Sequence, residues 1–149
     1  MSTAEKPTVE LKELNKFVGS WHTAGKIPAT TSTPEVKIHG TDTYEWLPGE
    51  YFLLHQADVM MGEDRSETFE VIGYDPWLGK YTMQHYDNKG HSGYMTATCE
   101  KDVWMFLGDT LRFTGSFKKM DSEFSGIWEQ LTDENTWVHF MDIALTRAQ

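Results

Sequence analysis

The stretch Phe17-Val18-Gly19-Ser20-Trp21 is where an expected helix meets the first expected strand. We expect a helix of about three turns over residues 8–18, with Thr8 as its N-cap and Gly19 as the residue that ends it. Its apolar residues form one stripe, at Leu11, Leu14 and Phe17 or Val18. So short a helix is marginal alone, so the stripe is expected to pack on the rest of the chain. With Trp21 opening a strand, the pattern favours a lid that closes one end of a barrel. A helix stop before an ordinary core tryptophan is the alternative.

Length and composition indicate one folded domain. The chain has 149 residues, 39% of them hydrophobic, and a mean hydropathy of -0.53. We expect residues 8–149 to form this domain and residues 1–7 to be a disordered tail. No apolar run approaches the roughly 20 residues of a transmembrane helix, and the first residues lack the features of a secretory signal. One cysteine, Cys99, excludes an internal disulfide and fits a reducing compartment, so we expect a cytoplasmic protein.

Acidic residues outnumber basic ones, and aromatic residues are frequent. Thirteen Lys and Arg against 23 Asp and Glu give a formal net charge of -10. This charge repels phosphate backbones and anionic membranes, so we expect neither nucleic acid nor a membrane as a partner. Phe, Tyr and Trp make up 13% of the chain. These residues favour strands and line ligand pockets, but they also fill ordinary cores.

From Val36 onward, turn signals recur at intervals of roughly ten residues. With the strand that begins at Trp21, they divide the chain into about ten expected strands: 21–27, 36–47, 51–60, 67–74, 80–86, 92–99, 103–107, 110–117, 124–131 and 136–146. Short turns join antiparallel neighbours, because parallel strands need long crossovers. A meander of this length has exposed edges unless it closes on itself. We therefore predict an all-β, up-and-down antiparallel barrel, with the short N-terminal helix capping one end and an interior able to hold a small ligand. An open meander or a sandwich is the rival architecture.

The longest expected loop covers residues 28–34, Pro-Ala-Thr-Thr-Ser-Thr-Pro, between the first two strands. A loop of this length at a barrel mouth can act as a gate. A plain connection is the alternative, and the sequence does not decide between them.

The chain resembles the calycin superfamily of lipocalin-like barrels. Their mark is a short helix leading into Gly-x-Trp on the first strand, here Gly19-Ser20-Trp21. The resemblance implies that a basic residue near the last strand packs over this tryptophan, a part that fits Arg147. From Leu14 to Arg147 the chain looks more closely like a bacterial family of lipocalin-like domains of unknown function. The matching stretches are 40–47, 49–53, 72–75, 80–81 and 111–115. The resemblance implies the fold and carries no activity with it.

The nitrobindin-like haem proteins are further relatives by architecture. They bind haem through a histidine near the C-terminal strand, and His139 lies in such a strand here. Their glycine-rich first strand is matched only in part, by Gly19 and Gly25. We expect no cofactor, and haem on His139 is the minority alternative.

Charged and histidine side chains in the middle of strands are the candidate binding residues. Arg112 comes first, because a guanidinium facing the lumen can hold a carboxylate with two hydrogen bonds. Glu70 is also mid-strand, and a charge facing the lumen is costly unless it is paired. His55, His85 and His139 would form a metal or haem site if they converged. No local metal-binding spacing occurs, so we expect no metal. For all of these, an exposed outer-face position is the alternative.

Aromatic residues supply the remaining candidates. Trp46, Trp104 and Trp128 are expected either in a pocket wall or in the barrel core. On the last strand, alternation separates two faces, one with Trp137, His139, Met141 and Ile143 and one with Val138, Phe140, Asp142 and Ala144. Both faces are mostly apolar, so which one looks inward stays open, and an apolar outer face favours a homodimer.

Four functions compete. The first is a binding protein that takes a small, mostly apolar or amphipathic molecule into the barrel, held by Arg112 or a histidine. The second is a haem or metal protein using His139. The third is an enzyme with a lumen acid–base pair such as His85 with Glu70, although no catalytic motif occurs and no catalytic residue is assigned. The fourth is an interaction module with a filled lumen.

Overall fold

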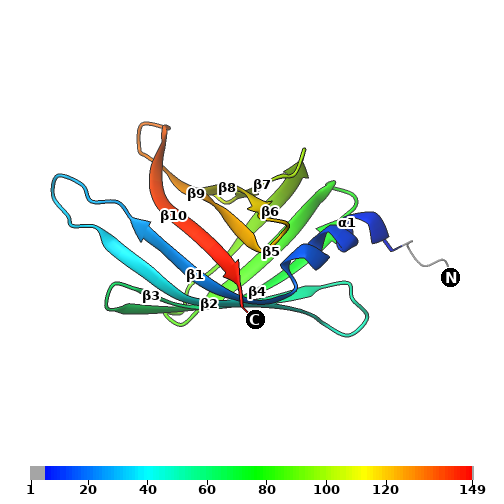
Figure 1. The fold of residues 1–149 in the computed structure, drawn as a ribbon. Coiled ribbons are helices and arrows are strands. Elements are labelled where there is room, and N and C mark those ends of the chain that lie inside the picture. Colours follow the sequence, from blue (N-terminus) through cyan, green and yellow to red (C-terminus); the bar gives the residue numbers. More distant parts are fainter. Residues whose placement is uncertain (1–5, 149) are drawn as a thin grey trace.

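The computed structural model describes residues 6–148, and their strands form one closed antiparallel barrel (Figure 1). Each strand pairs with its neighbours in the chain, and β1 pairs with β10 to close the barrel. The strands are β1 Gly19–Ile27, β2 Val36–Trp46, β3 Leu53–Met61, β4 Asp64–Asp75, β5 Lys80–Asp87, β6 Ser92–Glu100, β7 Val103–Leu107, β8 Leu111–Lys118, β9 Glu123–Leu131 and β10 Trp137–Arg147. The prediction of a ten-stranded up-and-down barrel is confirmed. Of the expected tail, residues 1–5 lie outside the described residues. Lys6 belongs to the expected tail and is described by the structure. Its Nζ donates a hydrogen bond to the carbonyl of Gly49 at 2.8 Å.

The N-terminal helix lies across one end of the barrel, as Figure 1 shows. It consists of an α-helix, α1 Thr8–Glu13, followed by a 3-10 turn, η1 Leu14–Phe17. The predicted Thr8 cap is wrong, because Pro7 is the residue before the helix and no side chain caps it. The predicted apolar stripe is buried, with Leu11, Leu14 and Phe17 each at most 4% exposed. The helix is therefore held by packing, as its short length requires.

Below the helix, aromatic side chains fill this end of the lumen. The Phe17 ring lies 4.9 to 5.3 Å, centre to centre, from four other rings: Tyr44, Trp104, Phe117 and Phe124. Trp21, Trp104 and Phe113 are among the largest fully buried side chains. Such clusters combine large apolar burial with favourable ring geometry. The half of the barrel next to the helix is thus a packed core.

Arg147, at the end of β10, ties the helix end to the first strand. Its guanidinium lies 4.1 Å from the centre of the Trp21 ring. It also donates hydrogen bonds at 2.8 Å to the carbonyls of Val18 and Lys16. Gly19 has φ +127°, and a Cβ there would stand 3.0 Å from the guanidinium. A side chain at position 19 would therefore crowd the arginine.

The opposite end of the barrel carries the β1–β2, β3–β4, β5–β6, β7–β8 and β9–β10 connections. The longest is the predicted loop after β1. Thr30 closes it internally, since its backbone amide donates to the carbonyl of Thr33 at 2.9 Å. Most of the loop's side chains are exposed. None of the helices in residues 6–148 is long and apolar enough to cross a membrane.

Candidate functional site

A cavity of about 320 Å³ occupies the half of the lumen away from the helix. Its floor is the aromatic core described above, and its walls come from all ten strands. The lining residues are Thr23, Ile38, Asp42, Tyr44, His55, Ala57, Val59, Met61, Ser66, Thr68, Glu70, Met83, His85, Met95, Phe106, Leu111, Trp128, Phe140, Met141, Ile143 and Leu145. A cavity of this size is at the lower end of the range for small-molecule sites. Only half of the lumen is therefore filled.

Five adjacent strands, β1 to β5, each place at least one polar side chain toward this cavity. We call this set the polar belt: Thr23 on β1, Asp42 on β2, His55 on β3, Glu70 on β4 and His85 on β5. His55 and Glu70 are cross-strand partners, and so are Glu70 and His85. Side chains of directly opposed residues lie close enough to interact. The sheet register therefore brings residues 13 to 62 positions apart into one continuous polar row.

His55 is the centre of the polar belt, because both of its ring nitrogens contact carboxylates. Nε2 lies 2.6 Å from Asp42 Oδ2, and Nδ1 lies 2.9 Å from Glu70 Oε1. Thr23 donates its hydroxyl hydrogen to the other oxygen of Asp42. The Tyr44 ring stacks flat on the imidazole, with 4.1 Å between ring centres. Asp42 and Glu70 are each 6% exposed, so the two carboxylates and the ring form a buried unit.

This unit shifts the ionisation of its members. Burial lowers the pKa of His55, but hydrogen bonds to Asp42 and Glu70 outweigh it and raise the pKa to about 9. Burial, together with the charge of Asp42, raises the pKa of Tyr44 well above its usual value. At neutral pH the imidazole is therefore a cation that donates from both nitrogens, while the phenol is neutral.

His85 stands beside this unit without joining it by a hydrogen bond. Its Nδ1 lies 4.0 Å from Glu70 Oε2, beyond hydrogen-bond range. Its ring covers Gly93 on β6, where a Cβ would come within 2.7 Å of Nε2. Any side chain at position 93 would push the ring aside. The sequence-based pairing of His85 with Glu70 required hydrogen-bond reach on adjacent strands. The two residues are on adjacent strands, but their side chains are not within hydrogen-bond reach, and the histidine that Glu70 bonds is His55.

The wall facing the polar belt is apolar. It is built from sulfur-containing, aromatic and aliphatic side chains, among them Met95, Phe106, Trp128, Met141 and Ile143. Trp128 is the one predicted tryptophan in this wall. A mostly apolar chamber with a few convergent polar groups is the usual composition of a small-molecule site.

Arg112, the first candidate for binding a ligand, does not face the lumen and takes the alternative position on the outer face. Its Nε donates to Glu129 Oε1 at 2.9 Å, and its guanidinium lies 4.5 Å from the centre of the Trp137 ring. Leu111 and Phe113, the residues on either side, point inward, so alternation turns Arg112 outward. Arg112 and Glu129 pair across β8 and β9 on the outer face.

Three other candidates also lie outside the cavity. His139 is on the outer face of β10, 3.2 Å from Asp142, because a bulge between His139 and Met141 resets the alternation. The three histidines therefore do not converge. Trp104 belongs to the packed core next to the helix. Trp46 is half-buried at the helix end, where its Nε1 donates to Asn15 Oδ1 at 2.8 Å.

Asp42, Thr23 and Tyr44 are site residues that the sequence-based reasoning missed. Strand β2 nevertheless carries a signal for two of them. Its alternation places Val36, Ile38, Gly40, Asp42, Tyr44 and Trp46 on one face and Lys37, His39, Thr41, Thr43 and Glu45 on the other. An aspartate on the apolar face of an alternating strand indicates a buried partner.

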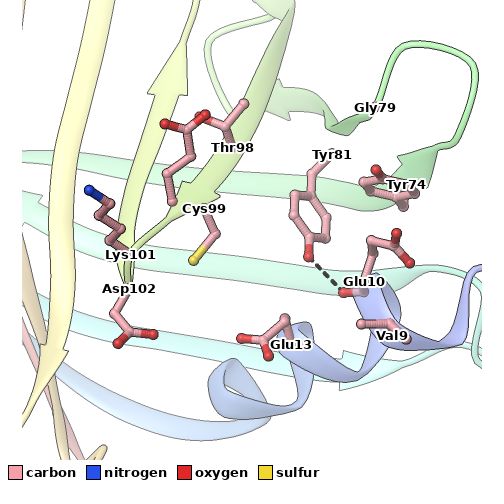
Figure 2. Close-up of a pocket in the computed structure, with 11 residues that line it drawn as sticks. Val9, Glu10, Glu13, Tyr74, Gly79, Tyr81, Thr98, Cys99, Lys101 and Asp102 are labelled. Carbon is pink, nitrogen blue, oxygen red and sulfur yellow. Dashed lines mark hydrogen bonds between the residues drawn. The ribbon is translucent and has the colours of Figure 1, made fainter.

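A second hollow lies at the rim, between the helix and the ends of β5 and β6 (Figure 2). There the Tyr81 hydroxyl donates to the carbonyl of Glu10 at 2.7 Å and ties the helix to β5. Burial raises the pKa of the Cys99 thiol, which makes it a poor nucleophile. The carboxylates shown around it, Glu13 and Asp102 among them, are on the open surface. None of the charged side chains that line this hollow is buried, so the lumen is the stronger candidate.

A metal ion has no ready site in the part of the chain that the structure describes. No group of three His, Cys, Asp or Glu side chains there is arranged to hold one. In the polar belt, both His55 nitrogens already face carboxylates, which leaves no imidazole lone pair for a metal.

Comparison with known proteins places the chain in a family. The family described as "Protein of unknown function (DUF1579)" matches residues 6–147, so the chain belongs to it. Among solved structures, the barrel is similar to the crystal structure of Rv2717c from M. tuberculosis, with a TM-score of 0.65. The two are 12% identical over 93% of this chain and 97% of the other, a likeness of fold alone. No curated protein matches the sequence.

Proposed function

We propose that this member of the family binds one small molecule in the open half of its lumen. The molecule is mostly apolar and turns a polar end toward the polar belt. The observation that carries the proposal is the cavity of about 320 Å³, apolar on one wall and lined on the other by Asp42, His55 and Glu70. Buried ionised groups are costly, and they are found mainly where they are paired or where they serve a site. Here they border an opening large enough for a ligand.

Binding accounts for this arrangement better than acid–base catalysis. His55 donates from both nitrogens, so it has no lone pair with which to take a proton from a substrate. Glu70 uses one oxygen on His55 and stands 4.0 Å from His85. The alternative of an interaction module requires a filled lumen, and only the half of the lumen next to the helix is filled. Haem on His139 does not fit, because that ring is outside the lumen.

Native mass spectrometry of protein purified gently from its own host tests the proposal. We expect a reproducible excess mass that disappears on denaturation. A cavity-filling variant, Ala57→Phe, should lose the excess mass, because position 57 lines the cavity. The matched control Gln56→Phe adds the same ring at the next, outward position and should keep it. An unliganded mass, together with no response of the wild-type chain or of Gln56→Phe to apolar probes, would reject the proposal.

A further inference from the structure

The contacts within the polar belt fix the summed charge of Asp42, His55 and Glu70. Two short contacts join His55 to carboxylates, and each needs a hydrogen between nitrogen and oxygen. A neutral imidazole supplies one hydrogen, so the second contact requires one extra proton. Asp42, His55 and Glu70 together therefore hold two carboxylates and one added proton, a net charge of -1. Wherever that proton lies between the three groups, the sum is the same.

No Lys or Arg among the described residues that line the cavity balances this charge. Thr23 and Tyr44 are neutral, and His85 is the remaining titratable group in the lining. The guanidinium expected to face the lumen, Arg112, is on the outer face with Glu129. A ligand carboxylate would therefore meet a chamber that is already negative and offers it no fixed cation.

One acceptor of the polar belt is open to the cavity. Glu70 is 6% exposed, its Oε1 accepts from His55, and no side chain in residues 6–148 donates to its Oε2. Every fully enclosed side-chain nitrogen or oxygen in the same residues has a hydrogen-bond partner, so Oε2 is reached from the cavity. A buried carboxylate oxygen without a donor favours a ligand that brings one.

Resting on the binding function proposed above, we propose that the lumen selects a protonated amine with an apolar body. The ammonium group donates to Glu70 Oε2, next to His85, and offsets the net charge of -1 on Asp42, His55 and Glu70. The apolar body lies against the opposite wall of Met95, Phe106, Trp128 and Met141. Aromatic faces and thioethers in that wall also favour a cation nearby.

Three probes with the same eight-carbon body test this selection: octylamine, 1-octanol and octanoate. Isothermal titration with ligand-free protein should give one site, with octylamine binding about tenfold or more tightly than octanol and octanoate weakest. Glu70→Gln should remove the advantage of the amine and leave octanol binding in place. The control Glu129→Gln makes the same change at an outer-face carboxylate and should keep the advantage, which separates the site from general attraction to a chain of net charge -10.

A second variant keeps the experiment decisive if Glu70→Gln does not fold. Thr68→Lys places a tethered ammonium in the lumen one inward position from Glu70 and leaves the partners of His55 intact. It should lower octylamine affinity at least about tenfold by competing for Glu70. Equal binding of amine and alcohol, or tighter binding of octanoate, would overturn the inference and leave the binding function standing. Failure of all three probes would also overturn it, and the native mass of the protein then decides the binding function separately.

Discussion

His55 couples the stability of the barrel to pH. Its pKa is about 9 in the folded chain against an ordinary 6.5, because Asp42 and Glu70 hold its protonated form despite burial. Below pH 6.5 both states are protonated, and the stabilisation is fully present. As pH rises through 9 the folded state must give up that proton, and the stabilisation is lost. We expect the free energy of unfolding to fall by about 3 kcal/mol between about pH 6 and pH 9.5.

Urea unfolding across this pH range checks the prediction. His55→Gln should abolish most of the pH dependence and lower stability at pH 6, since it leaves Asp42 and Glu70 poorly paired. His22→Gln, on the outer face of β1, should keep it. Burial also raises the pKa of Cys99, which acts in the same direction at the alkaline end and cancels in the comparison. A slope shared by wild type and His55→Gln would contradict the prediction.

Arg147 is the second residue with more than a local effect. It joins Trp21, the turn before β1 and the end of β10 through one stacking contact and two hydrogen bonds at 2.8 Å. We expect Arg147→Met to lower the free energy of unfolding by about 2 to 3 kcal/mol. The control Arg65→Met removes an exposed pair with Asp58 and should cost clearly less, because solvent screens exposed ion pairs. Chemical denaturation compares them, and equal losses would show that the Trp21 contact adds nothing.

At the scale of elements, the N-terminal helix closes one end of the barrel by packing its apolar side chains into the lumen. Phe17 contacts four aromatic rings in the packed half of the barrel. We expect Phe17→Ala to lower the free energy of unfolding by about 3 to 5 kcal/mol, because it leaves a cavity that rigid strands cannot close. Val9→Ala, at a helix position that is 73% exposed, should change it by less than about 0.5 kcal/mol. Thermal unfolding of the two variants tests this, and a small effect of Phe17→Ala would mean that the helix only rests on the barrel.

The elements were predictable from the sequence because their signals are local. Turn residues at short intervals set the ten strands, and the stripe of Leu11, Leu14 and Phe17 set the helix. Which face of each strand points into the barrel was harder to predict. On β10 both faces are apolar, and the bulge after His139 changes the alternation within the strand. The sequence around Arg112 does not indicate whether its side chain points into the lumen or outward. Its partner, Glu129, follows only from the register of β8 with β9.

The candidate site was harder to predict than the strands that carry it. Glu70, His55 and His85 were recognised as mid-strand polar residues, but their contacts depend on cross-strand register, which is a property of the closed sheet. Asp42 was missed although its place on the apolar face of β2 marked it. The sequence carries no signal that the lumen of the barrel divides into a filled half and an open half.

At the scale of the whole molecule, this division predicts uneven local stability. Amides in the packed half, around Leu53 and Trp104, should exchange hydrogen most slowly, because many buried contacts must break to expose them. Amides lining the open half, around Val59 and Ser66, should exchange faster in the ligand-free chain and slow when octylamine is added. Hydrogen exchange read by mass spectrometry measures both. Ala57→Phe should remove the effect of the ligand, while Gln56→Phe should keep it. Protection that appears instead around Glu10 and Cys99 would move the binding site to the rim hollow, because a ligand bound there contacts the helix and β6.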